Sequence, residues 1–271
     1  MRTPRLGAVP SRGTGLTILI VAGILFLIPI LGMLYFTFRQ VGSKTALTTA
    51  HYTAIFNPAN ELTYDGLFTG ITNSLGIAII TVLIVLVLLL PTMILVELRY
   101  PKLRSILEFV CLIPITIPSI VLVVGFVPVY QVVARLFGSN AWTLAFAIGV
   151  IVLPYAFRPI ATNLAAVEVN TLSEAARSLG ANWGEVLWRV ILPNLRRGIL
   201  SSAFITIAVV LGEFTIASFL SQNTFQTALF LIQQTDPYVA VIFSVAALLF
   251  AFVLLLIIGR VGSVGRNRRT A

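Results

Sequence analysis

Few side chains in this sequence have the chemistry of a catalytic or metal-binding site. The single histidine, His51, lies in a polar stretch, and the single cysteine, Cys111, lies in an apolar run. Because a nucleophile needs a nearby base and a metal ion needs several ligands, we expect no catalytic residues and no metal site in this chain. The sequence also has no G-x-x-x-x-G-K-S/T loop, so we expect it to lack an ATP site of its own.

Glu213 is the one carboxylate deep inside an apolar stretch, at 198–220. At about 1.5 Å per residue it would lie roughly 22 Å into a hydrocarbon core about 30 Å thick. An acid at that depth is costly and by default indicates a polar pathway. Two interpretations stay open: Glu213 contacts a translocating cation, or it makes an interhelical hydrogen bond or a subunit contact.

A polar interruption, residues 171–193, separates two long apolar stretches; we call it the docking segment. Thr171 and Glu174 have the spacing of a capping box, which predicts a helix from Leu172. Gly180 is predicted to close that helix at positive φ, and Asn182 with Glu185 is predicted to cap a second helix that Pro193 ends. The apolar faces predicted for the two helices are Leu172, Ala175, Ala176 and Leu179, and then Trp183, Val186, Leu187, Val190 and Ile191. Two short amphipathic helices with a glycine hinge are suited to docking.

The elements around this segment are apolar and long. The chain of 271 residues is 58% hydrophobic and only 10% charged, and its mean hydropathy is +1.02. This composition is typical of membrane proteins. We predict an all-α polytopic membrane protein with six spans at about 17–38, 73–96, 106–130, 142–161, 198–220 and 238–259.

Prolines interrupt several of these spans. The third contains Pro114, Pro118 and Pro128, and a proline removes a backbone hydrogen bond. The third span is therefore either a broken helix that lines a pathway or a helix kinked for packing. Asn73 and Ser74 open the predicted second span, as pathway residues or simply as a helix cap. Small residues four apart, such as Ala145 and Gly149, would permit close helix approach.

The basic residues set the orientation. The net charge is +9, and the charges lie between apolar spans, where they indicate topology and contact with anionic headgroups rather than nucleic acid. If both termini are cytoplasmic, fifteen Lys and Arg lie inside and three, Arg39, Lys44 and Arg135, lie outside. The positive-inside rule then puts residues 171–193 in the cytoplasm.

The docking segment also resembles a known family. Glu174-Ala175-Ala176, Gly180, Val190 and Leu192-Pro193 resemble the E-A-A motif in the cytoplasmic loop of type I ABC-importer permease subunits, with Val in place of the usual Ile. Asn73-Ser74-Leu75 and the run 212–218, Gly-Glu-Phe-Thr-Ile-Ala-Ser, are also similar to this family, and the latter favours its spermidine/putrescine-like branch.

Hydropathy and charge divide the chain into a cytoplasmic tail 1–16, a six-span domain 17–260 and a basic cytoplasmic tail 261–271. The resemblance implies that the loop 163–197 is a coupling loop, and it implies a set of partners. The partners would be ABC ATPase subunits, which hold ATP and Mg, an identical or homologous second permease, and an extracytoplasmic binding protein. The location would be the inner membrane of a prokaryote.

In this interpretation the docking segment contacts the ATPase, and the pathway candidates are Glu213, Asn73, Ser74, Pro114 and Pro118. The cargo would be a polyamine-like cation, or else ferric iron, thiamine, phosphonate, sulfate or molybdate. A secondary transporter or channel is the alternative from another class; it would favour internal symmetry or several intramembrane charges.

Overall fold

The computed structural model describes residues 12–42 and 46–263, and these residues form helices with no strand longer than an isolated bridge. Six of the described helical stretches are long and apolar enough to cross a membrane. The prediction of an all-α protein with six spans is therefore confirmed. The outer parts of the two predicted tails, 1–11 and 264–271, and Lys44 lie outside the described residues.

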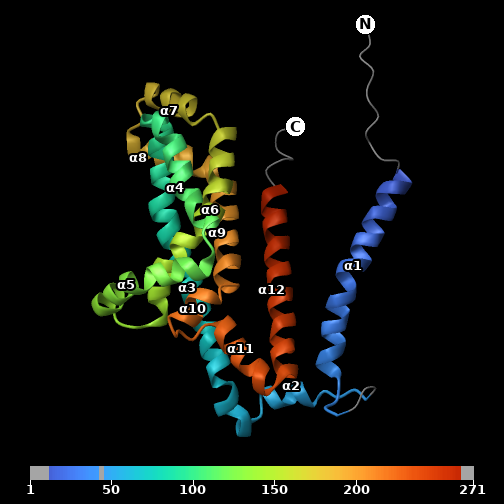
Figure 1. Ribbon diagram of the computed structural model, residues 1–271. Helices are drawn as coiled ribbons and strands as arrows, with labels where there is room; N and C mark the ends of the chain where they lie inside the picture. Colours follow the sequence, from blue (N-terminus) through green and yellow to red (C-terminus); the bar gives the residue numbers. More distant parts are fainter. Residues whose placement is uncertain (1–11, 43–45, 264–271) are drawn as a thin grey trace. The chain divides into compact units, whose positions relative to one another are not determined.

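The described residues form a series of α-helices, several of them linked by short 3-10 turns (Figure 1). Their bounds are α1 (Arg12–Phe38), α2 (Ala50–Ile55), α3 (Glu61–Arg99), α4 (Arg104–Thr116), α5 (Ser119–Phe137), α6 (Leu144–Ala166), α7 (Val169–Ser178), α8 (Trp183–Glu185), α9 (Leu192–Leu211), α10 (Thr215–Phe219), α11 (Phe225–Thr235) and α12 (Pro237–Ser263). A π-helical segment, η4 (Val186–Ile191), joins α8 to α9.

The chain divides into two compact units, of which the smaller comprises residues 1–61 and 232–249. Tyr238, near the start of α12, lies between two rings: its centroid is 4.8 Å from that of Phe36 and 4.3 Å from that of His51, in nearly parallel stacks. Thr37 and Tyr52 share a hydrogen bond of 2.6 Å between their hydroxyls. Stacked rings and a partly buried hydroxyl pair therefore hold one end of α1 to α2 and α12.

The larger unit, residues 62–231 and 250–271, contains the main apolar core. Its central contact is between α6 and α9, and α4 packs on the same helix α6. The buried positions of α9 are Leu195, Gly198, Ser202, Thr206 and Val210. Because these residues recur three or four apart, they form one face of the helix, which is the face turned toward α6.

Three predicted spans differ in their bounds. The second begins earlier than predicted, since α3 runs for 39 residues from Glu61. The third is two helices, because Ile117 is extended at φ −105° and ψ 128° and Pro118 follows it. The fifth starts at Trp183 and ends at Leu211, nine residues before the predicted end. Periodicity does not locate these ends, because the breaks are made by backbone conformations and by partners distant in sequence.

The closest approach of α6 and α9 involves a glycine that the small-residue pattern did not identify. A Cβ on Gly198 would lie 2.8 Å from Asn163 Cβ and 3.0 Å from Pro159 O, whereas a Cβ on Gly149 would meet nothing within 4 Å. Gly198 N–H also donates to Asn163 Oδ1 at 2.9 Å. The prediction of close helix approach at Gly149 is therefore wrong, and the contact lies at the other end of α6.

We expect Gly198→Ala to destabilise the protein because the added methyl group must push α6 and α9 apart. Overpacking of this kind costs about 1–3 kcal/mol. Gly149→Ala is the matched control: it also lies in a helix, its methyl group would meet nothing within 4 Å, and it should not lower stability. The midpoint of thermal unfolding in detergent is the measurement. Equal midpoints for the two variants would show that the Gly198 contact is not tight.

Candidate functional site

The first helix of the docking segment starts earlier than the sequence predicts. Helix α7 begins at Val169, its N-cap is Glu168, and no side chain caps it. The predicted capping box of Thr171 and Glu174 is therefore wrong. Val167 is extended and ends α6, and Val169 is buried, so the apolar anchor rather than the polar cap sets the start. Glu174 lies exposed in the middle of α7.

Gly180 closes α7 as predicted, with φ of +91°. Ala181 N–H donates to Ala176 O at 3.1 Å and Gly180 N–H donates to Arg177 O at 2.9 Å. This bond pair is the Schellman closure, which needs a left-handed residue where glycine has no steric penalty. The prediction that Gly180 closes this helix at positive φ is confirmed.

The second predicted cap is also confirmed. Glu185 N–H donates to Asn182 Oδ1 at 3.0 Å, and Asn182 N–H donates to Glu185 Oε2 at 3.0 Å, which completes a reciprocal capping box. Arg189 pairs with Glu185 at 3.6 Å, but its side chain is 79% exposed, so this pair contributes little to stability.

Pro193 does not end the second helix, contrary to the prediction. Helices α8, η4 and α9 form one continuous stretch from Trp183 to Leu211. Leu192 N–H donates to Leu187 O, five residues back, so the turn before Pro193 is wider than an α-turn. Proline lacks an N–H and needs space near the preceding turn, and this wider turn together with its place at the start of α9 accommodates it.

The docking segment has a buried side and an exposed apolar side. Val186 and Ile191 are buried, whereas Leu187, Val190 and Leu192 are half-buried. Leu179 is 90% exposed, Trp183 54% and Trp188 71%. Ala175 and Pro193 are also exposed, and Ala176 is half-buried. Of the predicted apolar faces, Ala175, Leu179 and Trp183 are thus uncovered by this chain.

Arg177 connects the two helices of the segment. Its guanidinium carbon lies 4.7 Å from the centre of the Trp183 ring, in a cation–π contact across the Gly180 turn. The hydrogen bond described above joins the chain before the docking segment to the chain after it. It links Asn163, in the last turns of α6, to Gly198, in α9. Sequence reasoning missed this pair, since an Asn and a Gly 35 residues apart carry no local signal.

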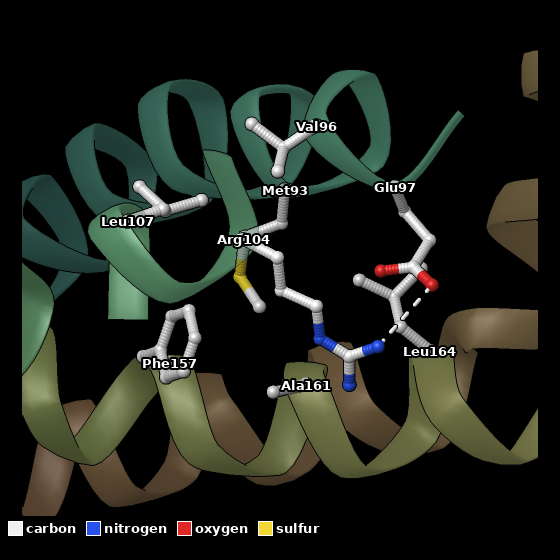
Figure 2. Close-up of a pocket in the computed structure, with 8 residues that line it drawn as sticks. All are labelled: Met93, Val96, Glu97, Arg104, Leu107, Phe157, Ala161 and Leu164. Carbon is white, nitrogen blue, oxygen red and sulfur yellow. Dashed lines mark ion pairs between the residues drawn. The ribbon is translucent and has the colours of Figure 1, made fainter. Parts of the chain in front are cut away.

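The turn between α3 and α4 packs next to the end of α6 (Figure 2). Arg104 Nη1 lies 3.5 Å from Glu97 Oε1. A cavity of about 20 Å³ beneath this ion pair is lined by Met93, Val96, Glu97, Arg104, Leu107, Phe157, Ala161 and Leu164. The space suits a water molecule rather than a solute, so this cavity is not a cargo site.

The break in the third span lies between Pro114 and Pro118. Pro114 is buried in α4, and its carbonyl accepts from Ile117 N–H at 3.4 Å because Pro118 has no N–H to offer. Pro118 is the N-cap of α5, and Val121 and Leu122 N–H both donate to its carbonyl. The break in the third span is confirmed, whereas α5 continues through Pro128. That the broken helix lines a pathway stays a prediction.

Asn73 and Ser74 are not a helix cap, because both lie inside α3. Asn73 Nδ2 donates to Asn223 O at 2.9 Å, and Ser74 Oγ accepts from Phe225 N–H at 2.8 Å. Asn223 Nδ2 in turn donates to Gly66 O at 2.9 Å. A Cβ on Gly70 would lie 2.7 Å from Thr224 O, so only glycine permits this approach. Four residues of α3 thus hold the turn before α11.

Glu213 lies in the break that ends the fifth span. Its two carboxylate oxygens accept from Ile216 N–H at 2.9 and 3.0 Å, and Oε2 also accepts from Ala217 N–H at 3.3 Å. Helix α10, which begins just after it, packs on α5 and α6. The helix that follows Glu213 therefore contacts α5, the second helix of the broken third span. The docking segment is a separate site.

Comparison with known proteins identifies relatives of this chain. Residues 97–264 match the family described as binding-protein-dependent transport system inner membrane component. The chain is 26% identical over 193 residues, 64% of its length, to the spermidine/putrescine transport system permease protein PotB of Haemophilus influenzae, covering 63% of that protein. It is 30% identical over 115 residues, 42% of its length, to the phosphate transport system permease protein PstA of Pasteurella multocida, covering 40%.

A third relative is the chloroplastic sulfate permease 2 of Chlamydomonas reinhardtii, 38% identical over 80 residues that make up 30% of this chain and 21% of that protein. The chain thus spans less than two thirds of the length of these relatives. The family match extends over more than half of the chain, from the end of α3 through the end of α12, and includes both the docking segment and the broken spans. This chain belongs to the inner membrane components of binding-protein-dependent transport systems.

Proposed function

We propose that this protein is the permease subunit of an ATP-driven importer and forms half of the translocation pathway for a small solute. The observation that carries the proposal is the docking segment. It is fixed internally by the Gly180 closure and the Asn182–Glu185 box, yet it exposes Leu179, Trp183 and Trp188. Exposed apolar side chains on a well-ordered element are typical of a binding surface.

The partner at this surface is an ATPase subunit. The chain has no phosphate-binding loop of its own, so hydrolysis with ATP and Mg occurs on another polypeptide. Glu174 and Ala175 are exposed on the same helix as Leu179, which suits contact with a groove of that subunit. An extracytoplasmic binding protein delivers the solute, and a second permease, identical or homologous, supplies the other half of the pathway.

The pathway runs beside the two broken spans. Backbone that leaves a helix at membrane depth is tolerated only where protein covers it or where it lines a wet cavity. Helix α10, which follows the break at Glu213, packs on α5, which follows the break at Pro118. Discontinuous helices form the solute sites of many transporters. Pro114, Pro118, Asn73, Ser74 and Glu213 shape this part of the pathway.

A polyamine-like cation is the proposed cargo. PotB aligns over the largest share of the chain among the relatives described, 64%, although the sulfate and phosphate permeases have higher identity over shorter stretches. Those two relatives make sulfate and phosphate the competing cargoes.

The cargo is tested by uptake into proteoliposomes that contain the complex with its ATPase, second permease and binding protein. We expect ATP-dependent accumulation of labelled spermidine, with competition by unlabelled putrescine. A complex lacking the ATPase is the control and should accumulate nothing. Uptake of labelled sulfate or phosphate instead would contradict the polyamine assignment, and uptake without the ATPase would indicate a secondary transporter.

Substitutions in the docking segment should separate hydrolysis from uptake. Gly180→Val forces a β-branched residue to positive φ, at a cost of about 1–2 kcal/mol, and Glu174→Lys reverses a charge on the exposed face. We expect both variants to raise the amount of ATP hydrolysed per solute imported. Gly180→Asn and Glu174→Gln are the matched controls, since Asn tolerates positive φ and Gln keeps the shape of Glu. Normal uptake and normal binding of the ATPase by both test variants would refute the docking role.

Both termini are proposed to be cytoplasmic. In a Cys111→Ala background, Arg5→Cys and Arg268→Cys should resist a membrane-impermeant thiol reagent in intact cells and react once the cells are opened. The charge distribution over the predicted loops motivates this expectation. Labelling of either position in intact cells would reverse the proposed orientation.

A further inference from the structure

The fifth span ends in a short reversal whose backbone groups need partners. Helix α9 ends at Leu211, Gly212 to Phe214 form a break, and α10 follows at Thr215. A helix that stops leaves carbonyl groups unpaired in its last turn, and a helix that starts leaves N–H groups unpaired in its first. In an apolar environment such groups must be satisfied by the protein itself.

Two side chains satisfy these groups. The Glu213 carboxylate accepts from Ile216 and Ala217 N–H at 2.9 to 3.3 Å, at the start of α10. At the end of α9, Gln226 Nε2 donates to Leu211 O at 3.0 Å. Glu213 therefore faces the positive end of α10 and acts as its cap, although it lies one residue before the N-cap position.

The helix held in this way is fixed on its other side by packing. Ile216 and Ala217, the residues whose N–H groups Glu213 accepts, are both fully buried. Helix α10 packs on α5 and on α6 (Figure 1). Movement of the Glu213 carboxylate would leave the N–H groups of Ile216 and Ala217 without their acceptor and would loosen the packing of α10 on α5 and α6.

We propose that Glu213 is a positioning residue of the pathway: its carboxylate anchors α10 at the break in the fifth span and does not read the charge of the cargo. This inference rests on the proposed transport function. A cargo cation would have to compete with the N–H groups that both carboxylate oxygens accept. The Glu213 carboxylate is thereby used inside the fold.

Glu213→Gln and Glu213→Ala separate the two roles. Glutamine has the same length and keeps a carbonyl oxygen that accepts a hydrogen bond, but it carries no charge. Alanine removes the acceptor as well. If Glu213 anchors α10, the glutamine variant should behave like the parent and the alanine variant should not. If Glu213 binds a cation, both variants should fail alike.

The reporter is a cysteine at Ser218, an exposed position on α10, in a Cys111→Ala background. In the purified complex with its ATPase, we expect Glu213→Gln to leave the reaction rate of Ser218→Cys with a water-soluble thiol reagent within twofold of the parent. Glu213→Ala should change that rate at least fivefold. Failure of only Glu213→Ala to assemble also supports the proposal, because it shows that the acceptor, not the charge, is required. An unchanged rate in Glu213→Ala, or equal changes in both variants, would overturn it.

Uptake of labelled spermidine, sulfate and phosphate gives a second readout. For whichever probe the parent complex imports, Glu213→Gln should leave the apparent KM within twofold. A tenfold rise in KM at an unchanged Ser218→Cys rate would assign Glu213 to cargo binding and overturn the proposal. If the parent imports none of the three probes, the cargo assignment fails, and the cysteine reporter still decides the role of Glu213.

Discussion

The need to satisfy backbone hydrogen-bonding groups where helices stop inside apolar surroundings shapes this protein. Each interruption has a local solution: Ile117 N–H takes over the Pro114 carbonyl, Glu213 caps α10, and Gln226 covers the Leu211 carbonyl. An unsatisfied group would cost several kcal/mol in such a place. Glu213 and Gln226 thus serve the backbone at the point where the fifth span leaves the helix.

Features that depend on neighbours in sequence were predictable. The apolar runs indicated six spans, Gly180 indicated a left-handed closure, and Asn182 with Glu185 indicated a cap, because each signal acts over a few residues. Two signals of the same kind failed. The buried Val169 starts α7 ahead of the predicted Thr171 cap, and the wide turn of η4 allows the helix to continue through Pro193.

The remaining features depend on contacts distant in sequence. Asn73 was visible as a polar residue at a predicted helix start, but its partner lies 150 residues further on. Two further hydrogen bonds also join residues distant in sequence: Ser74 with Phe225, 151 residues apart, and Asn163 with Gly198, 35 residues apart. Glycine at 70 and 198 carries no local signal, since its role is to leave space for atoms of another segment. A single sequence contains no information on such pairings unless the fold is known.

The unbroken run from Trp183 to Leu211 has a mechanical consequence. A helix of 29 residues at about 1.5 Å per residue is a rod roughly 40 Å long. One end carries the exposed Trp183, and the other ends at the break where Glu213 lies. Because a helix resists bending far better than a loop, a push or twist applied at Trp183 reaches Leu211 as a rigid-body displacement. Had Pro193 ended the helix, a flexible turn would join two separate helices. A displacement at Trp183 would then bend that turn instead of moving Leu211.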